Sequence, residues 1–441
     1  MHSGGAFRPR GLRALLLFGT SLGAALTAAG PAEAAGFYLQ EQSVRGWGRA
    51  NSGEVADRGP DSLWWNPAAI GGDARPSLSF GATGILPSGR ASDRGTLIDR
   101  PTAPPLPVGG AALVRDPVQR GVAPHFALSL PLSRRLALGL AVTSPYSFTS
   151  DYDPNGWQRY QAIRTRLVTL DLQPSIAFAP SEAISLGAGL NVEYSDALLS
   201  NALPNFAPGS PDARLRLTGN GWDFGWTAGV QFRPAPHLSI GLAYKSSVRH
   251  TLKGPLSITG LLAPLAGSNV QAATTARFST PWHLTFGIRG GVTDKVTLNA
   301  QVVRFGWSRF DTLRIGAPLG SAVPENYRDT WSVAVGADVA VNERLTLRAG
   351  LQADPTPTRD ASRDARVPDG NRIDYNVGAS LAAGSRLTLD LAAALTKPGS
   401  APISRDEHFY AGTAAQTDVL VEGVASRQRV IVVALGGRVA F

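Results

Sequence analysis

Residues 36–72 read GFYLQEQSVRGWGRANSGEVADRGPDSLWWNPAAIGG and do not look like the strand-like segments that follow them. Glycine and polar side chains interrupt the two-residue alternation that a strand requires. A disordered exported terminus is one interpretation, but disordered segments contain few aromatic residues. We therefore predict that residues 35–72 form a compact unit held inside a larger structure. The residues that favour this prediction are Trp47, Trp64, Trp65, Asn66, Pro67 and Ala68.

The residues before this unit are arranged like an export signal. Arg8, Arg10 and Arg13 form a cationic start, and residues 12–29 are apolar or small. A retained membrane anchor is the alternative, but glycine, serine and threonine make this run weakly hydrophobic for a span of about 20 residues. The sequence Ala32-Glu33-Ala34 matches a cleavage site, so we predict that residues 1–34 are removed and that the mature chain begins near Ala35.

Composition restricts the chemistry that the chain can carry. It contains no cysteine, which excludes disulfides and cysteine-bound metals. The formal net charge is +9, which suits lysine and arginine side chains that face anionic lipid or line a pore. Nucleic-acid binding is the other interpretation of a basic chain, but the arginines are scattered and no basic helix is predicted. We expect no nucleic-acid partner.

The rest of the chain alternates apolar and polar side chains. The pattern is clearest in residues 344–354 and 386–396. Membrane-spanning strands of about 9–11 residues alternate in this way, with apolar side chains outside and polar ones inside. No later run suits a spanning helix, so an exported membrane protein of this composition predicts a closed all-β barrel. The segments that qualify as strands are 76–86, 122–130, 134–144, 165–179, 183–198, 217–233, 237–253, 272–290, 294–310, 327–341, 344–354, 371–383, 386–396 and 427–441.

The connections between these segments alternate between short and long. Short polar turns such as 131–133 and 180–182 are followed by long connections such as 145–164 and 397–426. Outer-membrane barrels have short periplasmic turns and long extracellular loops, and an even strand number places both termini in the periplasm. We therefore predict a 14-stranded antiparallel barrel over residues 73–441 in the outer membrane of a Gram-negative bacterium. Its final residue, Phe441, resembles the aromatic signal that the outer-membrane insertion machinery reads.

Several segments resemble one known family. The stretches GFYLQEQSVRGWGRA (36–50) and SLWWNPAAI (62–70) are similar to the N-terminal hatch of the FadL/TodX (OMPP1) outer-membrane transporters of long-chain fatty acids and aromatic hydrocarbons. The resemblance implies a 14-stranded barrel plugged by the hatch. It also implies passive uptake of hydrophobic solutes, with capture by extracellular loops, passage past the hatch and lateral release. The implied partners are a hydrophobic small-molecule ligand, outer-membrane lipid and lipopolysaccharide. The similarity continues through residues 157–197, 221–254, 293–313 and 327–351.

Two extracellular loops differ from the family pattern. In that family, the third and fourth loops form an apolar landing groove. Here the third loop, 199–216, is short and rich in proline, whereas the fourth loop, 254–271, is apolar. The apolar side chains either pack against neighbouring loops or form an exposed patch that captures a hydrophobic ligand. They are Leu256, Ile258, Leu261, Leu262 and Leu265.

The resemblance further implies a lateral exit where the third strand bends inward. In this chain the third strand is predicted at 134–144, with Gly139 inside it and Pro145 directly after it. Glycine permits a bend, and proline lacks the N–H group that a ladder needs. We predict a lateral opening at Gly139, Ser144 and Pro145. A plain strand end at Pro145 is the alternative.

Arg159 and Arg164 are predicted contacts for an acidic headgroup if the ligand is a fatty acid. They lie in the segment most similar to the family near its extracellular side. Solvated loop charges are the alternative interpretation of both residues.

An enzyme is the least expected class, and we predict no cofactor and no metal site. The histidines are dispersed, and none has the spacing of a zinc motif. Barrel enzymes place serine, histidine and aspartate near the extracellular rim, where His250 and His408 could lie, but no spacing makes them a site. A hydrophilic porin or structural barrel is the other alternative, although a porin should lack the N-terminal hatch. The histidines of the mature chain are His125, His237, His250, His283 and His408.

Overall fold

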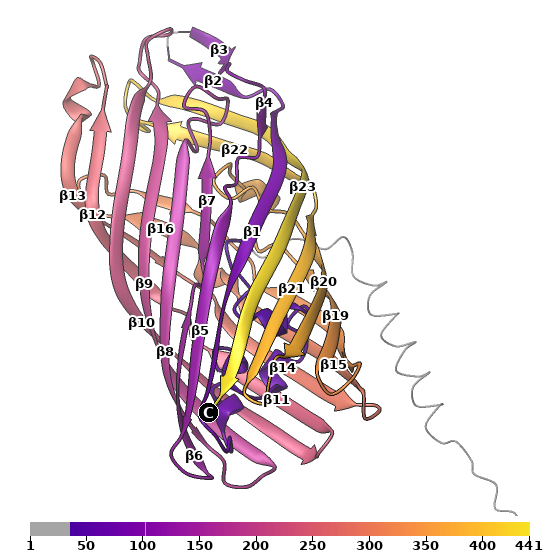
Figure 1. The fold of residues 1–441 in the computed structure, drawn as a ribbon. Helices are drawn as coiled ribbons and strands as arrows, with labels where there is room; N and C mark the ends of the chain where they lie inside the picture. The colour runs from indigo at the N-terminus through magenta and orange to yellow at the C-terminus, as the bar shows by residue number, and fades with distance from the viewer. Residues whose placement is uncertain (1–35, 102) are drawn as a thin grey trace, which may run out of the picture.

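The computed structural model describes residues 36–101 and 103–441. The predicted export signal with its cleavage site at 32–34, and the predicted mature start at Ala35, lie outside these residues. Within them, the strands form one closed antiparallel barrel, and residues 36–72 lie inside it near one end (Figure 1). The fold class predicted from the alternating segments is therefore confirmed.

The wall consists of 14 antiparallel strands, and each predicted segment overlaps one of them. Strand β23 pairs with β1 from Ser77↔Ala440 to Asp93↔Gly423, which closes the barrel and leaves no free sheet edge there. Three wall strands are each built from two shorter strands. In order, the wall comprises β1 (Ser77–Asp93), β5 (Gly121–Pro131), β6 (Leu136–Thr143) with β7 (Ser147–Asp151), β8 (Arg164–Phe178), β9 (Ile184–Leu203), β10 (Ala213–Ala235), β11 (Leu238–Lys245) with β12 (Arg249–Thr259), β13 (Val270–Ser279) with β14 (Trp282–Gly291), β15 (Val296–Gly306), β18 (Thr330–Ala340), β19 (Leu345–Asp354), β20 (Arg372–Ala382), β21 (Leu387–Pro398) and β23 (Thr417–Ala440).

Shorter elements extend the structure where the long connections lie, as β2, β3 and β22 show in Figure 1. No helix of the described part of the chain is both long and apolar enough to cross a membrane. These shorter elements are β2 (Leu97–Arg100), β3 (Ala103–Pro107), β4 (Leu113–Arg115), β16 (Thr312–Ile315), β17 (Ala322–Pro324), β22 (Ala401–Phe409), and the 3₁₀ turns η4 (Ala266–Ser268), η5 (Trp307–Arg309) and η6 (Asp360–Ser362).

The wall alternates as predicted over most of its height. On β19, the side chains of Leu347 and Leu351 are exposed, whereas those of Gln352 and Asp354 are buried in the interior. On β21, Leu391 is exposed and Asp390 is buried. Lipid solvates an apolar outer face, and hydrogen bonds inside the barrel satisfy the polar inner face.

The two ends of the barrel wall differ in their connections. At one end the strands are joined by tight turns, in which the N–H of Val292 donates to Val296 and that of Val341 donates to Leu345, both over 2.9 Å. The N–H of Phe441 donates to the carbonyl of Pro76 over 3.0 Å at this same end, where Figure 1 marks the C-terminus. That this end faces the periplasm, and that Phe441 is an insertion signal, stay predictions.

Two predicted loops are shorter than expected. Strand β9 runs to Leu203 and β10 begins at Ala213, while β12 runs to Thr259 and β13 begins at Val270. The prediction that Leu256 and Ile258 are loop residues is therefore wrong. Both side chains are buried on the inner face of β12, because the inward face of the barrel becomes apolar at this height.

Candidate functional site

The inner segment, called the hatch below (residues 36–72), is built from single turns. These are α2 (Val44–Trp47), η1 (Glu54–Ala56), η2 (Pro60–Ser62) and η3 (Pro67–Ile70). Turn η3 explains the Asn66-Pro67-Ala68 motif. The side chain of Asn66 accepts from the N–H of Ala68 over 3.0 Å, and Pro67 occupies the first position, where no N–H is needed.

Ion pairs attach the hatch to the wall. The buried guanidinium of Arg49 contacts Glu54 and lies 2.6 Å from Asp57, both within the hatch, and it reaches Asp338 of β18 at 3.3 Å. Asp338 is also contacted by Arg348 of the neighbouring strand β19 at 2.6 Å, and by Arg289 of β14, two strands away, at 3.3 Å. A buried charge that loses its partner costs several kcal/mol, so these pairs hold the hatch in one position.

The three tryptophans of the hatch lie in different environments. The indole N–H of Trp64 donates to Asp171 of β8 over 2.8 Å, and the ammonium of Lys245 lies 4.2 Å above its ring. Trp65 packs edge-on against Trp64 at 5.2 Å. The carbonyl of Trp47 accepts from Asn376 of β20 over 2.8 Å, and its ring is buried among alanine and valine side chains of β21 and β23.

The tip of the hatch fits against glycines of the wall. A Cβ atom at Gly187 of β9 would lie 2.2 Å from the Ala68 nitrogen, and one at Gly229 of β10 would lie 2.1 Å from the Asn66 amide oxygen. Only glycine leaves room for this approach. Asn66 also donates to the carbonyl of Val230 over 3.2 Å. The Asn-Pro-Ala motif is thus a contact to the wall.

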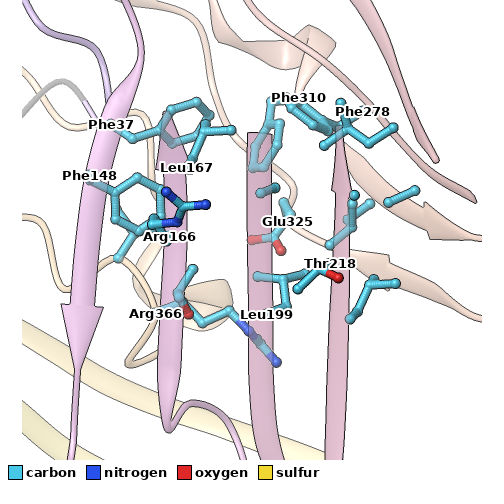
Figure 2. A pocket seen from close by; sticks show the side chains of 18 of the residues that line it. Phe37, Phe148, Arg166, Leu167, Leu199, Thr218, Phe278, Phe310, Glu325 and Arg366 are labelled. Atoms are coloured by element: carbon cyan, nitrogen blue, oxygen red, sulfur yellow. The ribbon is translucent and has the colours of Figure 1, made fainter. Parts of the chain in front are cut away.

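An apolar cavity of about 90 Å³ adjoins the hatch at Phe37 (Figure 2). Phe37 of the hatch lines it together with side chains of the wall from β7 to β13 and with Phe310, Leu313 and Tyr327 of the connection between β15 and β18. Almost the whole lining is hydrocarbon, which suits an apolar ligand. The main lining residues are Phe37, Phe148, Leu167, Ala197, Leu199, Leu217, Leu252, Ala276, Phe278, Phe310, Leu313 and Tyr327.

The apolar cavity exists because the polarity of the wall reverses along single strands. On β10, Trp222, Phe224 and Trp226 are exposed on the outer face, but Leu215 and Leu217 are buried on the inner face. The outer face beyond the aromatic residues is polar. At the level of Trp222 to Trp226 the outer face of the barrel is apolar. At the level of Leu215 and Leu217, closer to the long loops, the inner face is apolar instead.

The predicted loop residues do not form this cavity. Leu256, Ile258 and Leu261 are buried in the same hydrophobic cluster but do not line the cavity, while Leu262 is exposed and Leu265 is half-buried. Sequence reasoning missed the lining residues on β9, β10, β12 and β13. The change of apolar side chains from odd to even positions along β10 was the signal that would have found them.

Four charged residues, Arg166, Glu325, Asp364 and Arg366, border the cavity, and Figure 2 labels three of them, Arg166, Glu325 and Arg366. Arg366 is paired with Asp364. Burial, followed by the nearby charge of Asp364, raises the pKa of the Glu325 carboxyl to about 8, while Arg366 and Arg405 oppose the rise. Glu325 is therefore neutral at pH 7 and becomes charged in mildly alkaline solution.

This pKa predicts a pH-dependent affinity for apolar ligands. Ionisation of Glu325 above pH 8 adds a charge to the cavity wall, so the affinity for a neutral fluorescent hydrocarbon should fall between pH 7 and pH 9. Because the folded chain holds this proton more tightly than the unfolded chain, the contribution of Glu325 to stability also falls as pH rises above its ordinary pKa, and it levels off above about 8. Glu325→Gln should bind equally at both pH values. An equal decline in the variant would contradict this assignment.

A second cavity, of about 530 Å³, adjoins the first. Phe37, Phe148 and Leu167 line both cavities. The second cavity also includes Tyr38 of the hatch and reaches Val122 and Pro124 on β5, which are exposed on the outer face of the barrel. It therefore crosses the wall.

The wall is open where the second cavity crosses it. Pairing between β5 and β6 ends at Phe126↔Val142 and resumes, in the same register, at a bridge between Val118 and Ser150. Within the described chain, no ladder joins residues 120–125 to residues 143–148, a stretch of about 20 Å at 3.3 Å per residue. We call this stretch the wall opening.

The hatch borders the wall opening on its inner side. The N–H of Leu39 donates to the carbonyl of Pro145 over 2.8 Å, and Tyr38 forms a bridge with Tyr146. The side chain of Gln42 accepts from the N–H of Ser144 over 3.2 Å. The predicted residues Ser144 and Pro145 therefore lie at the edge of the opening.

Gly139 has another role than the one predicted. It lies within paired β6, opposite Ser129 and Ser175. A Cβ atom there would lie 2.7 Å from both Leu63 and Ile70 of the hatch. The prediction that Gly139 belongs to the opening is therefore corrected, because this glycine makes room for the hatch.

The two predicted headgroup arginines do not meet in the interior. Arg159 forms an ion pair with Asp212 at 2.7 Å, between two extracellular-type loops. Arg164 is half-exposed on the outer face of β8 and lies 3.6 Å from Asp151. The expectation that Arg164 contacts a ligand inside the barrel is corrected, because the alternation of β8 turns its side chain outward.

His250 lies in a polar cluster. Its Nδ1 is 3.2 Å from the Ser195 hydroxyl, and its Nε2 is 3.1 Å from Glu193. This arrangement resembles a serine-based catalytic site, but Ser195 is completely buried and presents no nucleophile to a solute. His408 is exposed and pairs with Asp418 at 2.7 Å. The two histidines belong to separate clusters.

Comparison with known proteins places these features in a family. Residues 25–440 match the family described as outer membrane protein transport protein (OMPP1/FadL/TodX). Outer membrane protein P1 of Haemophilus influenzae is 28% identical over 412 residues, which cover 85% of this chain and 88% of that protein. The long-chain fatty acid transport protein of Escherichia coli is 25% identical over 397 residues, covering 81% and 86%.

Solved structures show the same fold. A FadL homologue from Pseudomonas aeruginosa gives a TM-score of 0.81 at 24% identity, covering 92% of this chain and 100% of that one. The toluene transporter TodX of Pseudomonas putida gives 0.64 at 14% identity, covering 92% and 100%. The matched family and the closed barrel place the protein in the Gram-negative outer membrane. The chain belongs to the OMPP1/FadL/TodX family of outer-membrane transport proteins.

Proposed function

We propose that the protein takes up hydrophobic solutes passively and releases them sideways into the outer membrane. The relatives are named as transporters of long-chain fatty acids and of toluene, and both solute classes suit an apolar cavity. The observation that carries the proposal is continuity: the apolar cavity and the cavity that crosses the wall are both lined by Phe37, Phe148 and Leu167.

The proposed route begins at the long-loop end, which we assign to the extracellular side. A solute enters the apolar cavity, passes Phe37 and reaches the wall opening beside Pro145. Lateral release is favoured because each Å² of apolar surface transferred from water into lipid gains about 25 cal/mol. Release into the watery periplasm would forfeit that gain. The hatch then acts as a plug that closes the axial route.

A hydrophilic porin is less consistent with the interior. Among the described residues near the hatch, the charged side chains of Arg49 and Glu54 are fully buried against each other. A water-filled pore would hydrate such side chains. The apolar lining around Leu217 and Leu252 would also repel hydrated ions.

The cavity lining gives the direct test of ligand binding. Leu217→Ser combined with Leu252→Ser should weaken binding of a hydrocarbon probe at least tenfold, since covering one leucine is worth about 1.5–3 kcal/mol. Titration of the purified barrel with the probe would measure this. Leu262→Ser is the matched control, because that side chain is already exposed.

The Leu262→Ser control also distinguishes the two interpretations of the fourth-loop leucines, which are packing against neighbouring loops and an exposed patch that captures the ligand. An exposed capture patch would make Leu262→Ser the more damaging change. Unchanged affinity in Leu217→Ser/Leu252→Ser would remove the apolar cavity from the proposed route.

A further inference from the structure

A basic groove lies on the outer face of the barrel. It runs over β8, β9 and β10 beside the segment that follows β7. The inward-facing residues Thr165, Leu167 and Leu217 of the same strands line the apolar cavity, and, among the described residues, Arg166 is the one that borders both the cavity and the groove. The groove is lined by Asp151, Tyr152, Pro154, Ile163, Arg164, Arg166, Leu198, Ser200, Arg214 and Arg216.

The outer groove contains more arginine side chains than acidic side chains. Arg164 lies 3.6 Å from Asp151, and Arg166 contacts Asp196. Among the described residues, Arg214 and Arg216 have no ion-pair partner, and both are exposed. Two guanidinium groups therefore remain uncompensated in one depression of the surface.

The strand register brings these arginines together. Arg164 of β8 and Arg216 of β10 are both paired with Ser200 of the strand between them. Their backbones are thus about 10 Å apart, twice the strand spacing. On β10, Arg214 lies one outward-facing position before Arg216, and on β8, Arg166 lies one outward-facing position after Arg164. The four side chains surround a single patch.

The height of the outer groove matches a headgroup layer. Tyr194 and Trp222 pack on the outer face with ring centroids 5.1 Å apart, and such aromatic residues mark the membrane interface. Arg166 is paired with Leu198, four residues beyond Tyr194. The arginines therefore begin about 13 Å outside the aromatic row at 3.3 Å per residue.

We propose that the outer groove binds phosphate groups in the headgroup of an outer-leaflet glycolipid, the lipopolysaccharide. Arginine presents two parallel donors to one phosphate, which suits this chemistry better than a point charge. The site faces sideways, directly beyond the lipid-facing aromatics, so a membrane lipid reaches it without leaving the bilayer. The basic surface continues along neighbouring strands through Arg249, Lys253, Arg277 and Arg314, which are exposed on β12, β13 and β16.

The test uses the purified, folded barrel in neutral detergent and fluorescently labelled lipopolysaccharide. Arg214→Gln combined with Arg216→Gln should weaken binding of lipopolysaccharide at least tenfold, because each arginine near an anionic lipid surface contributes to the attraction and the variant removes two of them. Arg214→Lys/Arg216→Lys keeps the charge but loses the paired donors, so an intermediate loss is expected. Chemically dephosphorylated lipopolysaccharide should bind wild type and variants equally weakly.

The matched control removes two arginines from the short turns at the opposite end. Arg344→Gln/Arg386→Gln lowers the net charge equally at exposed positions and should leave the affinity unchanged. Equal binding by the Arg214/Arg216 variants and wild type would overturn the proposal. An equal loss of affinity in the turn control would also overturn it, because net charge alone would then explain the binding. Full displacement of lipopolysaccharide by inorganic phosphate at the same phosphate concentration would overturn it as well, because the groove would then be a free-anion site.

Discussion

Removal of residues 36–66 is expected to convert a poorly conducting barrel into an open pore. The hatch fills the lumen with buried side chains and fixes itself to the wall through Arg49, Asp57 and Trp64. Without it, wall residues such as Asp171 and Asp338 would face water along the whole axis. Single-channel recording in planar bilayers should show low current for the intact protein and sustained current for the deletion.

Two further variants make this expectation specific to the hatch. Deleting residues 411–414, at an exposed turn between β22 and β23, shortens the chain without touching the lumen and should leave the current low. Gly350→Val should raise it partly, because a Cβ atom at Gly350 would lie 2.2 Å from the Arg49 carbonyl and displace the hatch. Porin-like current through the intact protein would show that the hatch does not block the pore.

The barrel could be predicted because each wall strand obeys one simple rule at membrane height. Lipid accepts only apolar side chains, so positions such as Leu347 and Leu391 identify the outer face from sequence alone. The alternation of short and long connections then gives the strand count. Both inferences depend on local patterns, which a single sequence contains.

The apolar cavity could not be predicted from this alternation, because apolar side chains face outward only where the barrel contacts lipid. Beyond Trp222 the outer face meets polar surroundings and the inner face turns apolar, so Leu215 and Leu217 point inward. Strands β9, β10, β12 and β13 extend into this region, which the sequence suggested was loop. The same reversal turns Arg164 outward, from a predicted ligand contact to a member of the outer groove.

Contacts between the hatch and the wall depend on residues far apart in sequence. Gly139 reads as a bend in its own strand, yet its actual neighbours are Leu63 and Ile70. Likewise, the partner of Arg49 on the wall is Asp338, almost three hundred residues later. These contacts form only when the barrel closes around the hatch, so they cannot be predicted from the spacing of residues along the sequence.

A disulfide across the wall opening is expected to stop uptake, and its reduction is expected to restore it. Pro124 and Ser144 stand opposite each other if the register of Phe126↔Val142 continues by two residues. Because the chain has no cysteine, Pro124→Cys/Ser144→Cys introduces the only pair. Uptake of radiolabelled fatty acid by cells should fall to the background of cells without the protein under oxidising conditions.

The control disulfide joins the same two strands where they are already paired. Leu128 and Leu140 are register partners on the outer face, so Leu128→Cys/Leu140→Cys adds a cross-link without narrowing any gap. It should leave uptake unchanged, oxidised or reduced. A solute that instead passes the hatch along the axis would be insensitive to both cross-links, because neither reaches the lumen's far end. Full uptake by the oxidised Pro124→Cys/Ser144→Cys protein, with the disulfide verified by gel mobility, would therefore rule out lateral release here and leave the axial route.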